Sequence, residues 1–204
     1  MKKEEYILRK SRDIKEMASN LYNRKYIPLL IQLVGFKKLC EIGVDRAGFL
    51  CRLIKSNPEL LVGIDIWKND GIPGHMEKKR SDKQLEEDYL FVKKWALEQK
   101  TSVKIIRDYS ENACNSFEDN FFDFIYIDAD HTFNSIYNDL NIWYRKVKIG
   151  GILSGHDYHN LEKKKDNIKY GVVEAVNKFS IEKSIPFYLT KELKFPSFIF
   201  IKSV

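Results

Sequence analysis

The sequence predicts a doubly wound α/β fold, in which helices cover both faces of a mostly parallel β-sheet. Short apolar segments alternate with longer amphipathic segments from residue 38 to residue 184. The segment FDFIYI, 122–127, is almost continuously apolar, which is typical of a central strand buried on both faces. Two late β-like segments flank a proline-containing turn, which predicts an antiparallel hairpin at the C-terminus.

The first 35 residues predict a helical extension. Apolar positions lie scattered among charged ones, Pro28 interrupts the pattern, and the apolar run 29–34 ends at Gly35, a residue suited to ending a helix. No linker divides the rest of the chain. We therefore expect one domain over residues 1–204, made of this extension (1–35) and an α/β core (36–204).

From residue 36 onward, the elements follow in alternation. Strands are predicted at 38–43, 61–66, 103–106, 122–127, 152–156, 187–190 and 198–202. Helices are predicted at 47–57, 81–96, 110–117, 132–143 and 171–184. Ser81 with Gln84 forms a capping box, and Ser110 and Thr132 stand where they would cap their helices. Residues 68–80 contain two glycines and a proline, which indicates a loop.

The composition excludes several classes of protein. The chain has 44% hydrophobic and 31% charged residues, a balance typical of globular proteins rather than disordered ones. No apolar run reaches the ~18 residues of a membrane span, and the first residues do not resemble a secretory signal. Three cysteines without motif spacing predict free thiols in a reducing compartment, with the cytoplasm as the expected location. The net charge of +6 is spread along the chain, so nucleic acid is not an expected partner.

Acidic residues stand at or just beyond the ends of five consecutive predicted strands. They are Glu41, Asp65, Asp108, Asp128 and the pair His156–Asp157. In open α/β sheets, ligands bind beyond the carboxyl ends of the strands, where the strand order reverses. Converging carboxylates repel one another unless they share a cation or a polar ligand. The pattern therefore predicts a binding site at this edge of the sheet.

Three segments resemble class I S-adenosylmethionine-dependent methyltransferases. They are the turn CEIGVDRAG, the strand end VGIDIW and the block FDFIYIDADHTFNSIYNDLNIWYRKVKIGGILSGHDY. More narrowly, they resemble the small O-methyltransferases that include macrocin-type sugar methyltransferases. The resemblance covers about residues 36–160. It implies a seven-stranded Rossmann-like sheet with a C-terminal antiparallel hairpin, S-adenosylmethionine as cofactor, and a hydroxyl of a small molecule, sugar, nucleotide sugar or glycan precursor as acceptor.

The resemblance also implies where the cofactor binds. Carried over by position, Glu41 and Gly43 line the methionine part, Asp65 takes the ribose hydroxyls, Trp67 lies near the adenine, Asp108 receives the adenine amino group with Ser110 nearby, and Asp128 belongs to the same set. Two plainer interpretations stay open, in which Asp65 caps a turn and Trp67 only packs. The chain departs from the family at Ala47-Gly48-Phe49, where Gly-Gly-Ser is common; Ala47 suits a helix start if its φ is negative.

The resembling enzymes hold a divalent cation after the fourth and fifth strands. The corresponding residues are Asp128, His156 and Asp157, which predict a Mg²⁺ or Mn²⁺ site. The alternative is that Asp157 caps a turn and His156 is a hydrogen-bonded core histidine. Asp130 and His131 are the candidate bases for the acceptor proton, although His131 also stands where it would cap the next helix.

Three other functions would place different requirements on the sequence. A metal-independent O- or N-methyltransferase would need no cation. A nicotinamide-dependent oxidoreductase would be expected to have the dinucleotide-binding motif Gly-x-Gly-x-x-Gly, but the turn contains only Gly43 and Gly48. A binding module without turnover would not need acids at all five strand ends. The N-terminal helices are suited to pairing two subunits or to capping the acceptor pocket, and the basic loop 68–80 to covering the site or lying in solvent.

Overall fold

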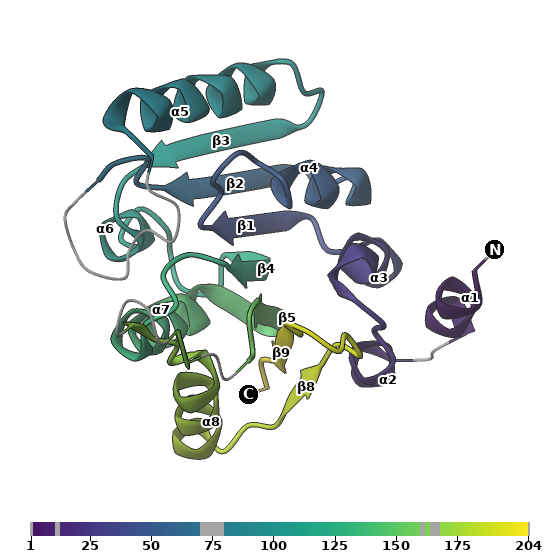
Figure 1. Ribbon diagram of the computed structural model, residues 1–204. Helices are drawn as coiled ribbons and strands as arrows, with labels where there is room; N and C mark the ends of the chain where they lie inside the picture. Colours follow the sequence, from purple (N-terminus) through teal and green to yellow (C-terminus); the bar gives the residue numbers. More distant parts are fainter. Residues whose placement is uncertain (1, 11–12, 70–79, 160–161, 164–167, 204) are drawn as a thin grey trace.

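A seven-stranded sheet forms the centre of the computed structural model, which describes residues 2–10, 13–69, 80–159, 162–163 and 168–203. The strands are β1 Lys38–Ile42, β2 Leu60–Asp65, β3 Ser102–Arg107, β4 Phe122–Ile127, β5 Val147–Gly155, β8 Phe187–Leu189 and β9 Phe198–Ile201, in the order β3-β2-β1-β4-β5-β9-β8 (Figure 1). β1 to β5 are parallel, and β9 is antiparallel to β5 and β8. The predicted fold class and the C-terminal hairpin are confirmed.

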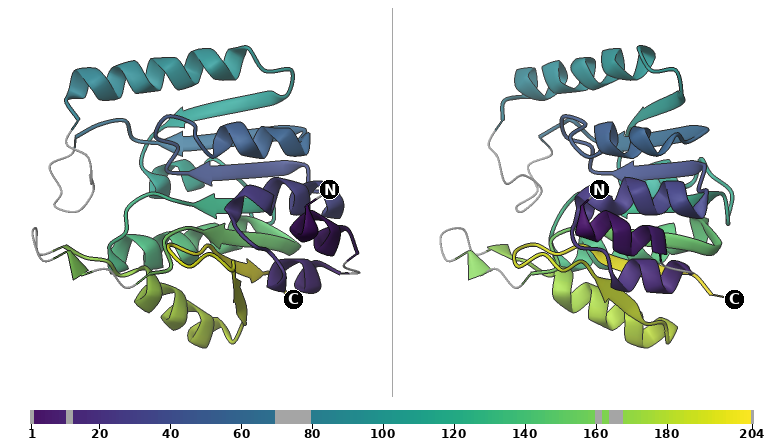
Figure 2. Two further views of the ribbon diagram at one scale, coloured as in Figure 1. Left: turned by 45° about the vertical axis from the view of Figure 1, so that its right-hand side comes forward. Right: turned by 90° about the vertical axis from the view of Figure 1, so that its right-hand side faces the viewer.

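Two groups of helices cover the sheet, one on each face. The first group is α1 Lys3–Lys10, α2 Ile14–Ser19, η1 Arg24–Tyr26, α3 Ile27–Val34, α4 Leu50–Leu53, η2 Ile54–Ser56 and α5 Asp82–Leu97. The second group is α6 Ser110–Cys114, α7 Phe133–Lys146 and α8 Val172–Lys183. α1, α2 and α3 gather on one side of the molecule (Figure 2). No helix among the described residues is both long and apolar enough to cross a membrane.

Alternation along the strands explains why the molecule has two apolar cores. In β4, Tyr126 packs into the core under the first group of helices, while Ile125 and Ile127 pack into the core under the second. In β1, Leu39 and Cys40 divide in the same way. All five side chains are at most 1% exposed. The prediction that 122–127 is a doubly buried central strand is therefore confirmed.

Several predicted boundaries were wrong, each for a local reason. The helix expected from Ala47 begins only at Leu50, because Asp45 and Ala47 have φ of 51° and 61°, outside the helical region. Pro28 lies in the first turn of α3 rather than between two helices. Ser110 does not cap α6, whose N-cap is Tyr109.

Other local predictions hold. The capping box of Ser81 and Gln84 starts α5, and the side chain of Thr132 accepts a hydrogen bond from the amide of Ser135 at the start of α7. Gly35 ends α3 in the left-handed conformation. A short antiparallel pair, β6 Glu162–Lys163 and β7 Ile168–Lys169, was not predicted. Of the loop 68–80, residues 70–79 lie outside the described residues.

The Asp123 carboxylate connects three segments near the start of β4. Its Oδ2 accepts hydrogen bonds from the backbone amides of Lys37 and Lys38, both at 2.8 Å. Its Oδ1 accepts one from Nζ of Lys148 at 2.6 Å. Burial would raise the pKa of Asp123, but these bonds outweigh it and hold the pKa below its usual value. The ionised carboxylate thus ties β1 and β5 to β4.

We expect Asp123→Asn to lower the free energy of unfolding by about 1–3 kcal/mol at pH 7, because an amide accepts weaker bonds than a carboxylate. The sign follows from the lowered pKa: the stabilisation is present above the pKa of the unfolded carboxyl and is lost as pH falls through the folded value. Urea unfolding should show a larger difference between variant and parent at pH 7 than at pH 3. Asp119→Asn, which removes an exposed ion pair with Arg145 and Lys146, is the control and should change little. Equal losses at both pH values would contradict the assignment.

Candidate active site

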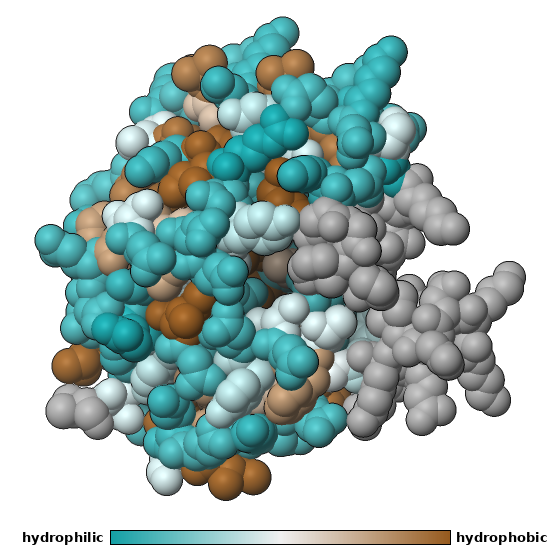
Figure 3. All heavy atoms as spheres, turned by 90° about the vertical axis from the view of Figure 1, so that its left-hand side faces the viewer, coloured by the Kyte–Doolittle hydropathy of each residue, from teal (hydrophilic) through white to brown (hydrophobic). Residues whose placement is uncertain are grey.

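The carboxyl ends of the parallel strands open onto a cavity of about 770 Å³. It lies where the strand order reverses between β1 and β4, as expected for an open α/β sheet. Figure 3 looks onto this side of the molecule, which is hollowed near its centre. Every predicted site residue lines the cavity: Glu41, Gly43, Asp65, Trp67, Asp108, Ser110, Asp128, Asp130, His131, His156 and Asp157.

Gly43 permits the close approach of two chain segments at the switch point. Its φ is 87°, and its amide donates to the carbonyl of Ile64 at 2.9 Å. A Cβ added here would lie 2.1 Å from the carbonyl oxygen of Asp128 and 2.7 Å from Cα of Ala129. Backbone atoms cannot give way as a flexible side chain can. Only a residue without a side chain therefore allows the turn after β1 to lie this close to the backbone after β4.

Glu41 presents an unsatisfied oxygen to the cavity wall. The residue is 2% exposed, and its Oε2 has no hydrogen-bond partner among the described residues. Burial, reinforced by the charge of Asp128, raises the pKa of Glu41 well above its usual value. Buried polar atoms normally have partners. A ligand with an ammonium group, such as the methionine part of S-adenosylmethionine, would satisfy this oxygen.

Asp65 holds the turns after β1 and β2 together. Its Oδ2 accepts from the amide of Asp45 at 2.8 Å, and its Oδ1 accepts from the amide of Trp67 at 3.0 Å. Burial raises its pKa, while these amides oppose the rise. The turn-capping interpretation is therefore seen in the structure. A carboxylate has about four lone-pair sites, so binding of ribose hydroxyls stays a compatible prediction.

Trp67 is mostly enclosed by protein. The residue is 2% exposed, its indole N–H donates to the carbonyl of Asp45 at 2.8 Å, and its ring lies 5.2 Å from that of Tyr89. The packing interpretation accounts for these contacts. Contact between Trp67 and an adenine stays a prediction.

The two predicted residues after β3 make bonds within the protein. Asp108 Oδ1 accepts from the amide of Tyr109 at 2.7 Å and from the side-chain amide of Asn112 at 2.9 Å. The Ser110 hydroxyl donates to Asp139 at 2.5 Å and accepts from the indole N–H of Trp143 at 2.7 Å. The recognition of adenine by Asp108 stays a prediction.

Asp139 lines the cavity and was missed from the sequence. It is 5% exposed, and burial raises its pKa to about 7, against the hydrogen bond from Ser110. A signal was present: Asp139 stands three residues after Ile136 and four before Trp143, on the apolar face of α7. An acid on that face has to be buried.

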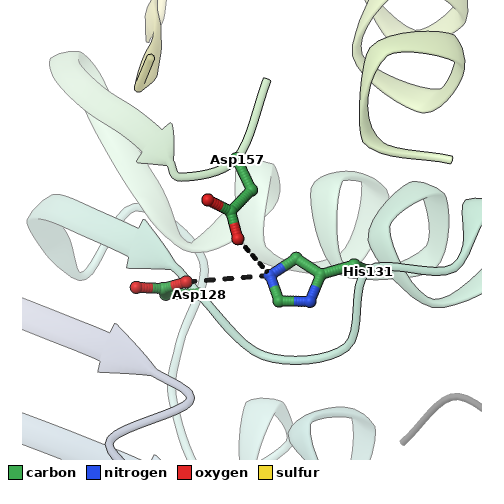
Figure 4. A group of neighbouring side chains, drawn as sticks. All are labelled: Asp128, His131 and Asp157. Atoms are coloured by element: carbon green, nitrogen blue, oxygen red, sulfur yellow. Dashed lines mark ion pairs between the residues drawn. The ribbon is translucent and has the colours of Figure 1, made fainter. Parts of the chain in front are cut away.

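Three side chains at the ends of β4 and β5 form a group able to hold a metal ion. One ligand atom from each of Asp128, His131 and Asp157 lies within 4.8 Å of the other two (Figure 4). His131 Nε2 is 2.8 Å from Asp157 Oδ2 and 3.9 Å from Asp128 Oδ1. The sequence placed His156 in this set and His131 among the bases; in the structure His131 completes the group.

His156 contacts the other carboxylate oxygen of Asp157. Its Nδ1 is 2.6 Å from Asp157 Oδ1 and 3.9 Å from Asp128 Oδ1. Asp157 has a φ of 57°, so the chain bends sharply at the end of β5. This bend lets His156 and Asp157, which would point to opposite faces of a straight strand, meet at one place.

The charges of this group are strongly coupled. Burial would lower the pKa of His131, but the two carboxylates outweigh burial and raise it to about 10. Burial would raise the pKa of Asp157, but hydrogen bonds from the two histidines hold it well below its usual range. At neutral pH the His131 imidazolium therefore offsets one of the two carboxylate charges. Two carboxylates and an imidazole also suit a divalent cation, which would take the place of the His131 proton.

Asp130 starts α7 together with Thr132. Its Oδ2 accepts from the Thr132 hydroxyl at 2.6 Å, and its Oδ1 accepts from the Thr132 amide at 3.3 Å. Asp130 also lines the cavity. Its role as the base stays a prediction.

Two arginines also line the cavity; Arg24 was missed from the sequence, and Arg80 was expected only as part of the basic loop 68–80. Arg24, from the N-terminal extension, donates through Nη1 to Asp128 Oδ2 at 3.0 Å. Arg80 donates to Asp88 Oδ2 at 2.5 Å and forms an ion pair with Asp45 in the turn after β1. Contacts across 104 and 35 residues leave no local pattern in the sequence. Only the fold brings these pairs together.

Comparison with known proteins agrees with this fold. A methyltransferase-domain family matches residues 40–158, more than half of the chain. A search of curated proteins gave no match. A Staphylococcus aureus protein assigned as a caffeoyl-CoA O-methyltransferase superposes with a TM-score of 0.64 and 13% identity, covering 87% of this chain and 82% of that chain.

Two further solved structures share the fold. The O-methyltransferase NovP has a TM-score of 0.61 and 14% identity, with 89% of this chain and 78% of that chain covered. An O-methyltransferase from Bacillus cereus in complex with S-adenosylhomocysteine has a TM-score of 0.58 and 13% identity, with 88% of this chain and 80% of that chain covered. From the family match, the fold and the cavity at the switch point, we conclude that this chain belongs to the methyltransferase-domain family and is an S-adenosylmethionine-dependent methyltransferase.

Proposed function

We propose that this enzyme methylates a hydroxyl of a small acceptor, with a divalent cation held by Asp128, His131 and Asp157. The observation that carries the proposal is the convergence of these three side chains within 4.8 Å at the carboxyl ends of β4 and β5. The solved structures that share the fold include enzymes described as O-methyltransferases. The cation would be Mg²⁺ or Mn²⁺, with the imidazole shifting the preference toward the softer ion.

The reaction needs few groups from the protein. The acceptor oxygen attacks the methyl carbon of the sulfonium in line; the S–C bond breaks, a C–O bond forms, and S-adenosylhomocysteine leaves. When bound, the cation lowers the pKa of the acceptor hydroxyl. Asp130 takes the proton, and the turn at Gly43 and the carboxylate of Asp65 hold the cofactor in line.

The acceptor class follows from the same cluster. A cation with open positions binds two neighbouring oxygens well, as in a vicinal diol or a hydroxyl beside a carboxylate. Sugars and nucleotide sugars carry such pairs, and the resemblance to macrocin-type enzymes supports that choice. The division of the chain into an extension (1–35) and a core (36–204), a homodimer and a cytoplasmic location also stay predictions.

A second candidate is a metal-independent O-methyltransferase. The observation that favours it is the 2.8 Å contact between His131 Nε2 and Asp157 Oδ2, a pairing found in general bases. Against it stands the pKa of His131 of about 10, which keeps the imidazole protonated at neutral pH. A protonated imidazole cannot accept the acceptor proton.

A screen for the acceptor tests the proposal. Methyl-labelled S-adenosylmethionine is incubated with nucleotide sugars, free sugars, hydroxy acids and matched amines, in Mn²⁺. The proposal expects label on the oxygen of an acceptor that carries two neighbouring oxygens. Transfer to amines with none to hydroxyls would overturn it.

We expect Asp65→Ala to weaken binding of S-adenosylhomocysteine by about 5- to 150-fold, or roughly 1–3 kcal/mol, through loss of charged hydrogen bonds to ribose. Calorimetry measures the affinity, and urea unfolding verifies that the variant is folded. Glu111→Ala is the matched control, since Glu111 is an exposed carboxylate on the same cavity wall. Unchanged affinity in a folded Asp65→Ala variant would refute the ribose assignment.

A further inference from the structure

Arg24 brings a fixed positive charge to the candidate metal cluster from outside the family-matched region. It lies in η1, ahead of residues 40–158. Its Nη1 donates to Asp128 Oδ2 at 3.0 Å, and its guanidinium lies 5.8 Å from the centre of the Phe49 ring. The side chain lines the cavity and is 34% exposed. The N-terminal extension therefore contributes directly to the active site.

The two oxygens of Asp128 face different partners. Oδ2 accepts the bond from Arg24. Oδ1 lies 3.9 Å from both His131 Nε2 and His156 Nδ1, on the side of the metal-binding group. Arg24 thus occupies one oxygen and leaves the other turned toward the place where a cation would bind.

Charge and orientation act on that cation in opposite directions. The bond from Arg24 orients Asp128, which favours metal binding. Its charge, however, repels a divalent ion held by the same carboxylate. The repulsion energy is proportional to the product of the two charges and is large at short distances. Arginine cannot lose its proton in a protein. Arg24 carries one positive charge and the cation carries two. Their repulsion outweighs the stabilisation that one orienting hydrogen bond to Asp128 provides.

We propose that Arg24 is a positioning residue that neutralises Asp128 and thereby keeps a divalent cation weakly held and exchangeable at Asp128, His131 and Asp157. This inference rests on the proposed function, because it concerns the same cation. With no cation bound, the guanidinium of Arg24 offsets the charge of Asp128 across their 3.0 Å hydrogen bond. When a cation binds, Arg24 remains and reduces the charge available to it.

Three variants separate charge from orientation. Arg24→Gln keeps an N–H donor and removes the charge, whereas Arg24→Lys keeps the charge and changes the geometry. Arg52→Gln removes the same charge from another position on the cavity wall. Mn²⁺ alone is the probe, and its affinity is measured by calorimetry and by the spin resonance signal of free Mn²⁺. Urea unfolding of the metal-free proteins is measured in parallel.

We expect Arg24→Gln to bind Mn²⁺ at least tenfold more tightly than the parent, about 1.4 kcal/mol, and to be less stable without metal. Arg24→Lys should remain close to the parent, and Arg52→Gln should tighten binding far less than Arg24→Gln. Misfolding does not raise affinity, so a merely structural role predicts no such gain. Unchanged or weaker binding in Arg24→Gln, with the parent binding Mn²⁺, overturns the role of Arg24 alone. Absence of Mn²⁺ binding in both parent and Arg24→Gln overturns the proposed metal site as well.

Discussion

Asp157→Asn is expected to reduce methyl transfer by about 10²-fold or more while leaving the affinity for S-adenosylhomocysteine unchanged. Asp157 contacts both His131 and His156, at 2.8 and 2.6 Å, and supplies one of the three proposed ligands. An amide is neutral and a poorer ligand than a carboxylate, so the cation is lost with the charge. Asparagine tolerates the φ of 57° at this position, so the backbone is not strained by the change.

Asp130→Asn is the matched comparison for that variant. Asp130 lines the same cavity, and its carboxylate accepts a hydrogen bond from the Thr132 hydroxyl. It should therefore retain Mn²⁺ and lose turnover by the ~10²–10⁴-fold of a missing base. Mn²⁺ titrations and turnover numbers measured on both variants distinguish ligand from base. Parental Mn²⁺ affinity in Asp157→Asn would exclude Asp157 as a ligand.

Gly43→Ala is expected to lower the free energy of unfolding by about 2–5 kcal/mol. Part of the loss is the ~1–2 kcal/mol cost of a Cβ at positive φ. The rest comes from the clash with the backbone of Asp128, 2.1 Å from the added atom, at the ~1–3 kcal/mol typical of overpacking. A chain of this size loses roughly 2–4 °C of Tm for each kcal/mol.

Gly35→Ala isolates the second contribution. Gly35 has a φ of 82°, close to that of Gly43, but a Cβ there would meet nothing within 4 Å. It should therefore lose only the conformational part. Urea unfolding of the two variants gives the difference, and cofactor affinity should fall only in Gly43→Ala. Equal losses of stability would mean that the contact with Asp128 does not matter.

The sheet was predictable because its signals are local. The apolar run at 122–127 and the capping residues Ser81 and Thr132 act within a few residues of themselves, and the structure confirms each. The predicted helix start at Ala47 was wrong, and the residue types in this segment do not show why. Left-handed φ at Asp45 and Ala47 is set by the closure of the turn onto Asp65 and Arg80.

The candidate site divides in the same way. Acids at strand ends were found because strand ends can be located from sequence, and they line one cavity. Which histidine completes the metal-binding group depends on how the segments after β4 and β5 lie relative to each other, and the bend at Asp157 has no signal in the sequence. Arg24 reaches Asp128 across 104 residues, so its role depends on how the N-terminal extension packs.

Turnover of the metal-free enzyme tests the central claim most directly. With the acceptor identified by the screen, methyl transfer is measured in EDTA and again after addition of excess Mg²⁺ or Mn²⁺. The arrangement of Asp128, His131 and Asp157 predicts that transfer stops in EDTA, that S-adenosylhomocysteine still binds, and that either cation restores transfer. Full transfer in EDTA by protein verified to be free of metal would contradict a cation-assisted reaction and leave base catalysis to Asp130 or His131 alone.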